Sequence, residues 1–349
     1  MFYLLTKIMA IYLGILIFSF ITTCIAIVPF IDLLYKLHFF HREPIVPATP
    51  LEKTEFDRIS SKARWKLGTP TGGGVLLIVL VSILFLLLFP IIIRFGVYIT
   101  TAFPIKDQLN VIFFTFISFG LLGFYDDIIK VFNLSPNSYW RKKAIFEVLF
   151  SFLSAFMMYT NLHIQIIYLP VIGVIHLGIF YIPIAALIIL FFCRAFDITD
   201  GLDGLASGVL LICLLAFWAI SVSALDTVLS TFISLWIGGL IAFLYFNVFP
   251  ARIWLGNAGS LSFGATLAVV GLILGKTFPL LLIGGIFVIE AAMHYGQKVY
   301  YYLFNRKLFV IAPLHYFLES IGWPEPKIVQ RLWLAAIAFA FLGLWVATA

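Results

Sequence analysis

The sequence predicts an all-α integral membrane protein, a bundle of ten transmembrane helices with its active site in cytoplasmic loops. Of its 349 residues, 63% are hydrophobic and only 11% are charged, and the mean hydropathy is +1.12. Soluble domains carry about 25% charged residues, so this chain could not cover itself with polar surface. Its apolar runs are continuous, whereas the strands of a membrane β-barrel would alternate apolar and polar residues. We expect one polytopic domain over residues 1–349.

Ten apolar runs are long enough to cross a bilayer as helices. The first, residues 8–30, is longer than the apolar core of a signal peptide, so we expect it to be retained. We expect a break in the ninth run at Gly296. The other nine runs are residues 72–93, 108–127, 144–161, 179–195, 203–222, 229–248, 260–275, 278–302 and 328–347.

Basic residues predict the orientation of the bundle. All but four of the 22 Lys and Arg residues fall in loops on one side of the membrane. The exceptions are Lys7, Arg94, Lys106 and Lys276. Because cytoplasmic loops carry the excess of Lys and Arg, this side should face the cytoplasm. Nearly all Asp and Glu residues lie on the same side, which favours chemistry at one surface over a transport pathway through the bilayer.

The central polar stretch is residues 196–206, between two strongly apolar runs. Its carboxylates, Asp197, Asp200 and Asp203, are spaced three residues apart, and a glycine follows each of the last two. Carboxylates at a membrane surface are costly unless a cation compensates them, so we expect a functional site here. The alternative is an ordinary helix cap made by Asp or Thr, but three acids and two glycines exceed what a cap needs.

Two other loops carry groups suited to phosphate. The first runs from Lys66 through Thr71 to Gly74, and a glycine-rich helix entrance can bind an anion, although it can also be a plain turn. The second contains Asp126, Asp127 and Lys130. Adjacent carboxylates repel each other unless Mg²⁺ or basic partners lie close, and Arg141, Lys142 and Lys143 could be those partners.

The remaining polar groups lie in the last third of the chain. Trp254, Gly256 and Asn257 precede a predicted helix and offer a ring for stacking a base, although Trp is common at membrane interfaces. Glu290, His294 and Lys298 form a polar stripe on an apolar helix, which lines a groove or packs in the bundle, and His315 lies in the next loop. Together these loops suit Mg²⁺-assisted phosphoryl transfer between a cytosolic donor and a lipid phosphate.

The order of these motifs resembles the phospho-N-acetylmuramoyl-pentapeptide transferases, a branch of the polyprenyl-phosphate N-acetylhexosamine-1-phosphate transferases. The segment Thr-Asp-Gly-Leu-Asp-Gly-Leu-Ala is shared with the wider group, whereas Ala-Pro-Leu-His is specific to the muramoyl-pentapeptide branch. The resemblance extends from about Lys66 to Trp333. The matching segments are residues 68–74, 123–130, 198–206, 256–261, 312–315 and 322–325.

The resemblance implies UDP-N-acetylmuramoyl-pentapeptide and undecaprenyl phosphate as substrates, lipid I and UMP as products, and Mg²⁺ as cofactor. It implies a multi-pass protein of the bacterial inner membrane that can form a homodimer, and no nucleic-acid partner. The implied catalytic residues are Lys66, Asp126, Asp127, Asp200 and His315. The implied substrate-binding residues are Thr71, Lys130, Lys143, Arg194, Asp203, Trp254 and Gly256. The candidate metal ligands are Asp127, Asp197, Asp200 and Asn257.

The chain departs from the family's pattern at four places. A triple histidine is here His315-Tyr316-Phe317, an Asn-x-x-Asn is Arg194-Ala195-Phe196-Asp197, a Gly-Asp is Gly256-Asn257, and a Gln is Glu147. We hypothesise that Asp197 compensates for the carboxylate lost at Asn257, and that Arg194 replaces lost phosphate contacts. The alternatives are a related UDP-N-acetylhexosamine transferase and an inactive homologue acting as a scaffold.

Overall fold

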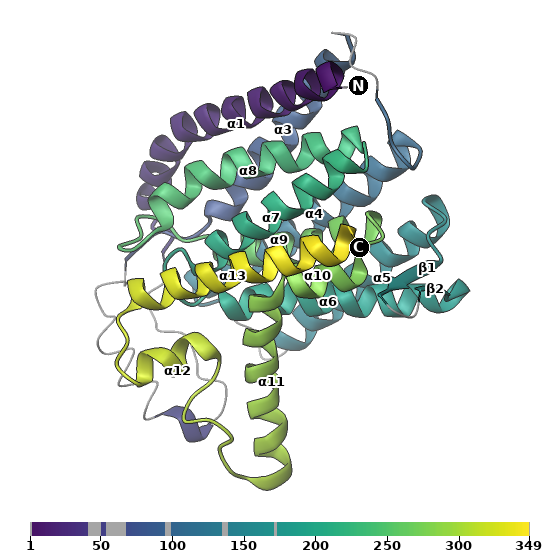
Figure 1. The fold of residues 1–349 in the computed structure, drawn as a ribbon. Helices are drawn as coiled ribbons and strands as arrows, with labels where there is room; N and C mark the ends of the chain where they lie inside the picture. The colour runs from purple at the N-terminus through teal and green to yellow at the C-terminus, as the bar shows by residue number, and fades with distance from the viewer. Residues whose placement is uncertain are drawn as a thin grey trace.

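The computed structural model describes residues 2–40, 50–53, 68–94, 99–134, 139–170 and 173–348. Almost all of this part of the chain is helical (Figure 1). The helices before the central turn are α1 (Phe2–Lys36), η1 (Pro50–Glu52), α3 (Gly73–Arg94), α4 (Ile105–Val131), α5 (Tyr139–Asn161), η3 (Gly178–Phe180) and α6 (Tyr181–Thr199). After it come α7 (Leu205–Ser223), α8 (Thr227–Asn247), α9 (Gly256–Ile273), α10 (Thr277–Ile283), α11 (Gly285–Phe304), α12 (Leu314–Ser320) and α13 (Glu325–Thr348).

The prediction of a multi-span α-helical membrane protein is confirmed. Within the described residues, nine helices are long and apolar enough to cross a membrane, and α10 with α11 would make a tenth span. This pair is bent by 79°. The expected break at Gly296 is wrong, because Gly296 lies inside α11 and the chain bends at Gly284. A Cβ at Gly284 would lie 2.5 Å from the Phe192 ring, so glycine allows close packing at the bend.

The helices α8 and α9 form the centre of the bundle. Of their most apolar 18 residues, 89% are buried, against 22% for α13. Between these helices and α4, the rings of Phe116, Phe232, Trp236 and Phe263 pack against one another. The outer helices expose large apolar side chains such as Leu86, as expected for surfaces that face lipid.

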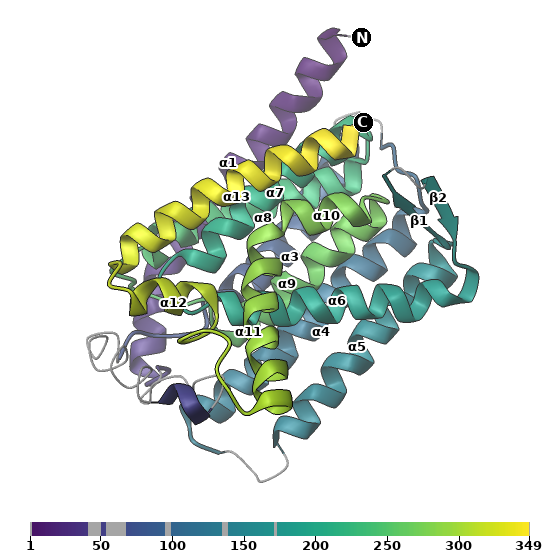
Figure 2. The same ribbon diagram turned by 60° about the horizontal axis from the view of Figure 1, so that its bottom comes forward.

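The two ends of the bundle differ in character. At one end, strands β1 (Ile166–Leu169) and β2 (Gly173–His176) form an antiparallel hairpin that the hydropathy pattern did not predict. Both ribbon views place this hairpin at the opposite end from α12 (Figures 1 and 2). The α12 end carries the α6–α7 turn, the last turn of α4 and the first turn of α9. These three segments contain the predicted site residues Asp126, Asp127, Lys130, Asp200, Asp203, Gly256 and Asn257.

Candidate functional site

The first turn of α9 is fixed by a carboxylate from α4. Asp127 is buried, and its two oxygens accept hydrogen bonds from the backbone N–H groups of Asn257 (2.8 Å) and Ala258 (3.0 Å). A carboxylate in this position satisfies free N–H groups and interacts favourably with the helix dipole. Asp127 therefore anchors α9 against the end of α4.

Glycines allow this close approach. A Cβ at Gly123 would lie 2.0 Å from the carbonyl oxygen of Asn257, and one at Gly74 would lie 2.2 Å from the amide nitrogen of Gly259. Gly256 has φ +75°, and a Cβ there would lie 2.7 Å from both Asp127 Oδ2 and Thr71 Oγ1. The glycine-rich entrance of α3 and the segment before α9 therefore meet at Asp127. This proximity is necessary if the two motifs are to bind the same substrate.

Asp126 belongs to a separate group of charges. Its carboxylate pairs with Lys143 of α5 (2.5 Å) and with Lys130 one turn later on α4 (3.2 Å), and it accepts a hydrogen bond from the side-chain amide of Asn257. The other oxygen, Oδ1, is buried and has no hydrogen-bond partner among the described residues. Adjacent carboxylates on one helix are therefore stabilised in different ways, Asp127 by backbone N–H groups and Asp126 by two lysines.

Two of the departures from the family's pattern contact each other. Arg194 of α6 forms an ion pair with Glu147 of α5, whose side chain is fully buried and lies 3.9 Å from Lys143 Nζ. Asp197, one turn beyond Arg194, accepts a hydrogen bond from the Ser260 hydroxyl at 3.1 Å. Arg194 is thus paired within the protein, and its charge is balanced by Glu147.

The α6–α7 turn concentrates negative charge. Burial, followed by the charges of Asp197, Asp127 and Asp203, raises the pKa of Asp200 from 3.8 to about 8. Asp203 accepts hydrogen bonds from the Trp254 indole (3.2 Å) and the Ala251 backbone (3.0 Å). Its own amide donates to Glu325 at 2.7 Å. Asp203 therefore holds the loop before α9 and the start of α13 beside the turn.

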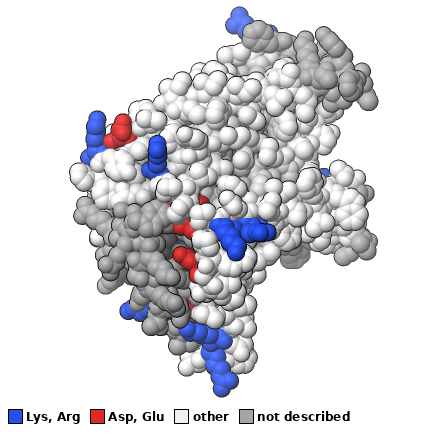
Figure 3. All heavy atoms as spheres, turned by 60° about the vertical axis from the view of Figure 1, so that its left-hand side comes forward, with Lys and Arg blue, Asp and Glu red and all other residues white. Residues whose placement is uncertain are grey.

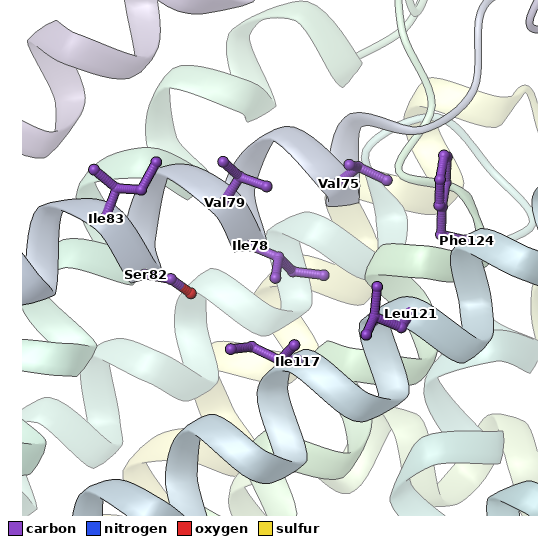
Figure 4. A pocket seen from close by; sticks show the side chains of 9 residues that line it. Val75, Ile78, Val79, Ser82, Ile83, Ile117, Leu121 and Phe124 are labelled. Carbon is purple, nitrogen blue, oxygen red and sulfur yellow. The ribbon is translucent and has the colours of Figure 1, made fainter.

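Figure 3 shows how charge is distributed on one face of the molecule. Carboxylates gather near the middle of this face with Lys and Arg around them, while most of the rest of the face is uncharged. A different kind of surface lies between α3 and α4, where residues such as Val75, Ile117 and Phe124 line an apolar groove of about 290 Å³ (Figure 4). Such a lining suits hydrocarbon and excludes a charged nucleotide.

His315 approaches the central turn from α12. Its Nδ1 lies 3.1 Å from Glu290 Oε2 of α11, and both side chains are fully buried. A Cβ at Gly201 would lie 2.4 Å from His315 Nε2 and 3.0 Å from the Tyr316 hydroxyl. His315, predicted to lie in a loop, is in the first turn of α12. This turn contacts the stretch that carries Asp200, although the two are more than a hundred residues apart in the chain.

Comparison with known proteins identifies the family. The family model for glycosyl transferase family 4 matches residues 109–275. The phospho-N-acetylmuramoyl-pentapeptide-transferase of Clostridium botulinum (strain Eklund 17B) is 32% identical over 281 residues, covering 80% of this chain and 82% of the relative. The enzymes with this name from Borrelia turicatae (33% identity, 84% and 88% covered) and Borrelia hermsii (34%, 80% and 82%) are similarly close. The chain belongs to the phospho-N-acetylmuramoyl-pentapeptide-transferase family.

The resemblance inferred from the motifs is confirmed, and the chain is a membrane-embedded transferase of peptidoglycan synthesis. The structure brings the predicted site residues of this transferase to one end of the bundle, except Lys66, which lies outside the described residues. Sequence reasoning missed the contacts of Ser260 and Glu325, which hold Asp197 and Asp203. Both belong to matching motifs, but a motif does not show which partner a residue has.

The predicted Mg²⁺ ligands of this transferase fit the ion only in part. Among the described residues, no three Asp, Glu, His or Cys side chains are grouped as a metal site. Mg²⁺, however, is usually held by one or two carboxylates together with substrate phosphates and waters. Asp200, surrounded by other acids, has the charge environment that a divalent cation would relieve. The residues therefore fit a metal that arrives with a diphosphate better than one held by the protein alone.

Proposed function

We propose that this chain transfers phospho-N-acetylmuramoyl-pentapeptide from its UDP-linked donor to undecaprenyl phosphate, with Mg²⁺, at the cytoplasmic face of a bacterial inner membrane. One observation carries the proposal. The segments that contain Asp127, Asp200 and His315 lie together at one end of an apolar bundle. A donor from water and an acceptor from the lipid leaflet can reach such a site together.

The reaction is a displacement at phosphorus. An oxygen of undecaprenyl phosphate forms a new P–O bond to the β-phosphorus of the donor, the bond from that phosphorus to the bridging oxygen breaks, and UMP leaves with the electron pair. The products are lipid I and UMP. Mg²⁺, held by Asp200 with Asp127, Asp197 or Asn257, would neutralise charge on the diphosphate.

The protein's own groups position the reactants. Lys130, half-buried beside Asp126, can bind the acceptor phosphate where it enters from the membrane. Trp254 is held by its bond to Asp203 beside the central turn, where its ring can stack on uracil. The N–H groups of Thr71, Gly73 and Gly74 already donate to backbone carbonyls. The buried Thr71 hydroxyl, beside Gly256, is the group of this turn that can donate to the diphosphate.

Release of UMP by the purified protein tests the proposal. We expect release with the muramoyl-pentapeptide donor, undecaprenyl phosphate and Mg²⁺ together, and none when a chelator removes the metal. Release with UDP-N-acetylglucosamine instead would assign the chain to a related hexosamine transferase. No release with either donor would indicate a scaffold without activity.

A further inference from the structure

Glu52 is a buried carboxylate in the segment between α1 and α3. It is the last residue of the short helix η1, and its side chain is fully buried. Its Oε1 accepts hydrogen bonds from the backbone N–H of Ala312 (2.8 Å) and from the side-chain amide of Gln297 on α11 (3.0 Å). A buried carboxylate is costly unless donors face it, and these two donors stabilise Glu52. Glu52 therefore joins η1 to residues that lie 245 and 260 positions further along the chain.

Gln297 holds the connection between α11 and α12 against α11. Its side chain is fully buried, and Nε2 also donates to the Phe309 carbonyl at 3.0 Å. Its Oε1 accepts hydrogen bonds from the backbone N–H groups of Leu308 (3.1 Å) and Phe309 (2.9 Å). An amide side chain has two N–H groups and an oxygen with two lone pairs, so Gln297 uses its full hydrogen-bonding capacity here. Figures 1 and 2 show η1, drawn in dark blue, beside this connection.

The connection that Glu52 holds leads directly into the helix that carries His315. Only two residues separate Ala312 from His315, and both Ala312 and His315 are buried. His315 lies against the central turn, where a Cβ at Gly201 would be 2.4 Å from its Nε2. Because the packing leaves no free space there, a shift of α12 would change how His315 meets the turn. The position of His315 therefore depends in part on hydrogen bonds made to Glu52.

We propose that Glu52 is a positioning residue of the transferase, which fixes the connection before α12 and so holds His315 beside the central turn. The inference rests on the proposed function, because it concerns the same site. It gives the segment between α1 and α3 a part in the reaction that no motif in the sequence indicated. A misplacement of about 1 Å, caused by a change away from the chemistry, can lower turnover about 100-fold.

Two substitutions at Glu52 separate its hydrogen bonds from its charge. Glu52→Ala removes the acceptor of both bonds, and we expect UMP release to slow by about 10–100-fold, as for residues that orient others. Glu52→Gln removes the charge but keeps an oxygen that can accept both bonds, so it should retain most of the wild-type rate. Lys53→Ala is the matched control, since Lys53 is the exposed neighbour of Glu52. A wild-type rate in Glu52→Ala, or an equal loss in Glu52→Gln, would overturn the proposal.

Exchanging the two side chains tests whether the contact itself matters. Gln297→Glu removes the amide donor and places a second carboxylate against Glu52, so we expect a loss of rate at least as large as in Glu52→Ala. Adding Glu52→Gln returns an amide donor to the pair, and the double variant should be about tenfold faster than Gln297→Glu alone. Losses that multiply would overturn the proposal, because the two side chains would then act independently.

Amide hydrogen exchange tests the contact without a donor substrate. In detergent, we expect Glu52→Ala to speed exchange at Ala312 by about tenfold or more, the effect of losing one hydrogen bond to a charged group. Exchange in Glu52→Gln should stay close to that of the wild type. The β1–β2 hairpin, at the opposite end of the bundle, is the internal control and should exchange alike in all variants. Unchanged exchange at Ala312 in Glu52→Ala would overturn the contact.

These measurements separate the failure of this inference from the failure of the proposed function. If the wild type releases no UMP, the function is wrong, and hydrogen exchange still decides whether Glu52 holds the connection. If the wild type is active and Glu52→Ala exchanges faster without losing rate, the contact exists but does not position the site, and the inference is wrong.

Discussion

Adding one methyl group at Gly123 of α4 should push the first turn of α9 away from Asp127. In Gly123→Ala the new Cβ would lie 2.0 Å from the Asn257 carbonyl oxygen and 2.6 Å from the Ala258 Cα. Both are backbone atoms, so no side chain can rotate away, and α9 must shift by about 1 Å or more to restore contact distance. The shift would stretch the bonds from Asn257 and Ala258 to Asp127.

The expected losses of stability and of turnover follow from the clash and from the stretched hydrogen bonds. Overpacking costs about 1–3 kcal/mol, and loss of the carboxylate cap adds about 1 kcal/mol. A misplacement of about 1 Å can lower turnover about 100-fold. We expect a lower thermal unfolding temperature in detergent and a loss of UMP release of that order.

Gly296→Ala is the matched control. Among the described residues, and apart from the neighbouring residues and the backbone of α11 itself, no atom lies within 4 Å of a Cβ added at Gly296. Alanine should therefore raise the stability of the helix by about 0.5–1 kcal/mol or leave it unchanged. If Gly123→Ala behaves like Gly296→Ala in both assays, the reasoning from close helix contact is refuted.

Three further predictions concern charge. Glu147→Gln or Arg194→Asn alone should lower the free energy of unfolding by about 3–5 kcal/mol, because each leaves the other side chain unpaired. The double variant should recover most of this loss. Equal unfolding temperatures for the three variants would contradict a stabilising ion pair. The pKa of Asp200 is about 8 in the folded protein, against 3.8 for a free side chain. Its contribution to the free energy of unfolding is therefore fully present below pH 3.8 and is lost as the pH rises through about 8. Unfolding in a chelator should therefore show that Asp200→Asn is more stable than the wild type above about pH 8, and an identical pH dependence would refute this. Finally, Asp197→Asn should abolish Mg²⁺-dependent turnover; intact turnover there, with improvement in Asn257→Asp, would exclude a compensating exchange.

Hydropathy was sufficient to predict most of the fold. Each predicted span overlaps a helix, since a bilayer requires long apolar runs with satisfied backbone groups. The bend was misplaced because the prediction placed it at the lone Gly296 and not at the pair Gly284-Gly285, where the Phe192 ring packs against Gly284. The β1–β2 hairpin was missed because its strands are short and apolar like the neighbouring spans.

The candidate site was predictable as a set of residues but not as a set of contacts. Asp126 and Asp127 are neighbours in sequence, yet one pairs with lysines and the other caps α9. Arg194 and Glu147 were recognised separately as departures, and their pairing depends on how α5 packs against α6. Such contacts between helices are set by tertiary packing, which motif order does not record. The homodimer stays a prediction.

Binding of the donor in the presence and absence of Mg²⁺ tests the central claim most directly. The claim is that the segments of Asp127, Asp200 and His315 form one site for a metal-bound diphosphate. Calorimetry should show that wild-type protein binds UDP-N-acetylmuramoyl-pentapeptide more tightly with Mg²⁺, and that Asp200→Asn and His315→Asn each weaken this binding. Binding that neither the metal nor these substitutions change would contradict the account.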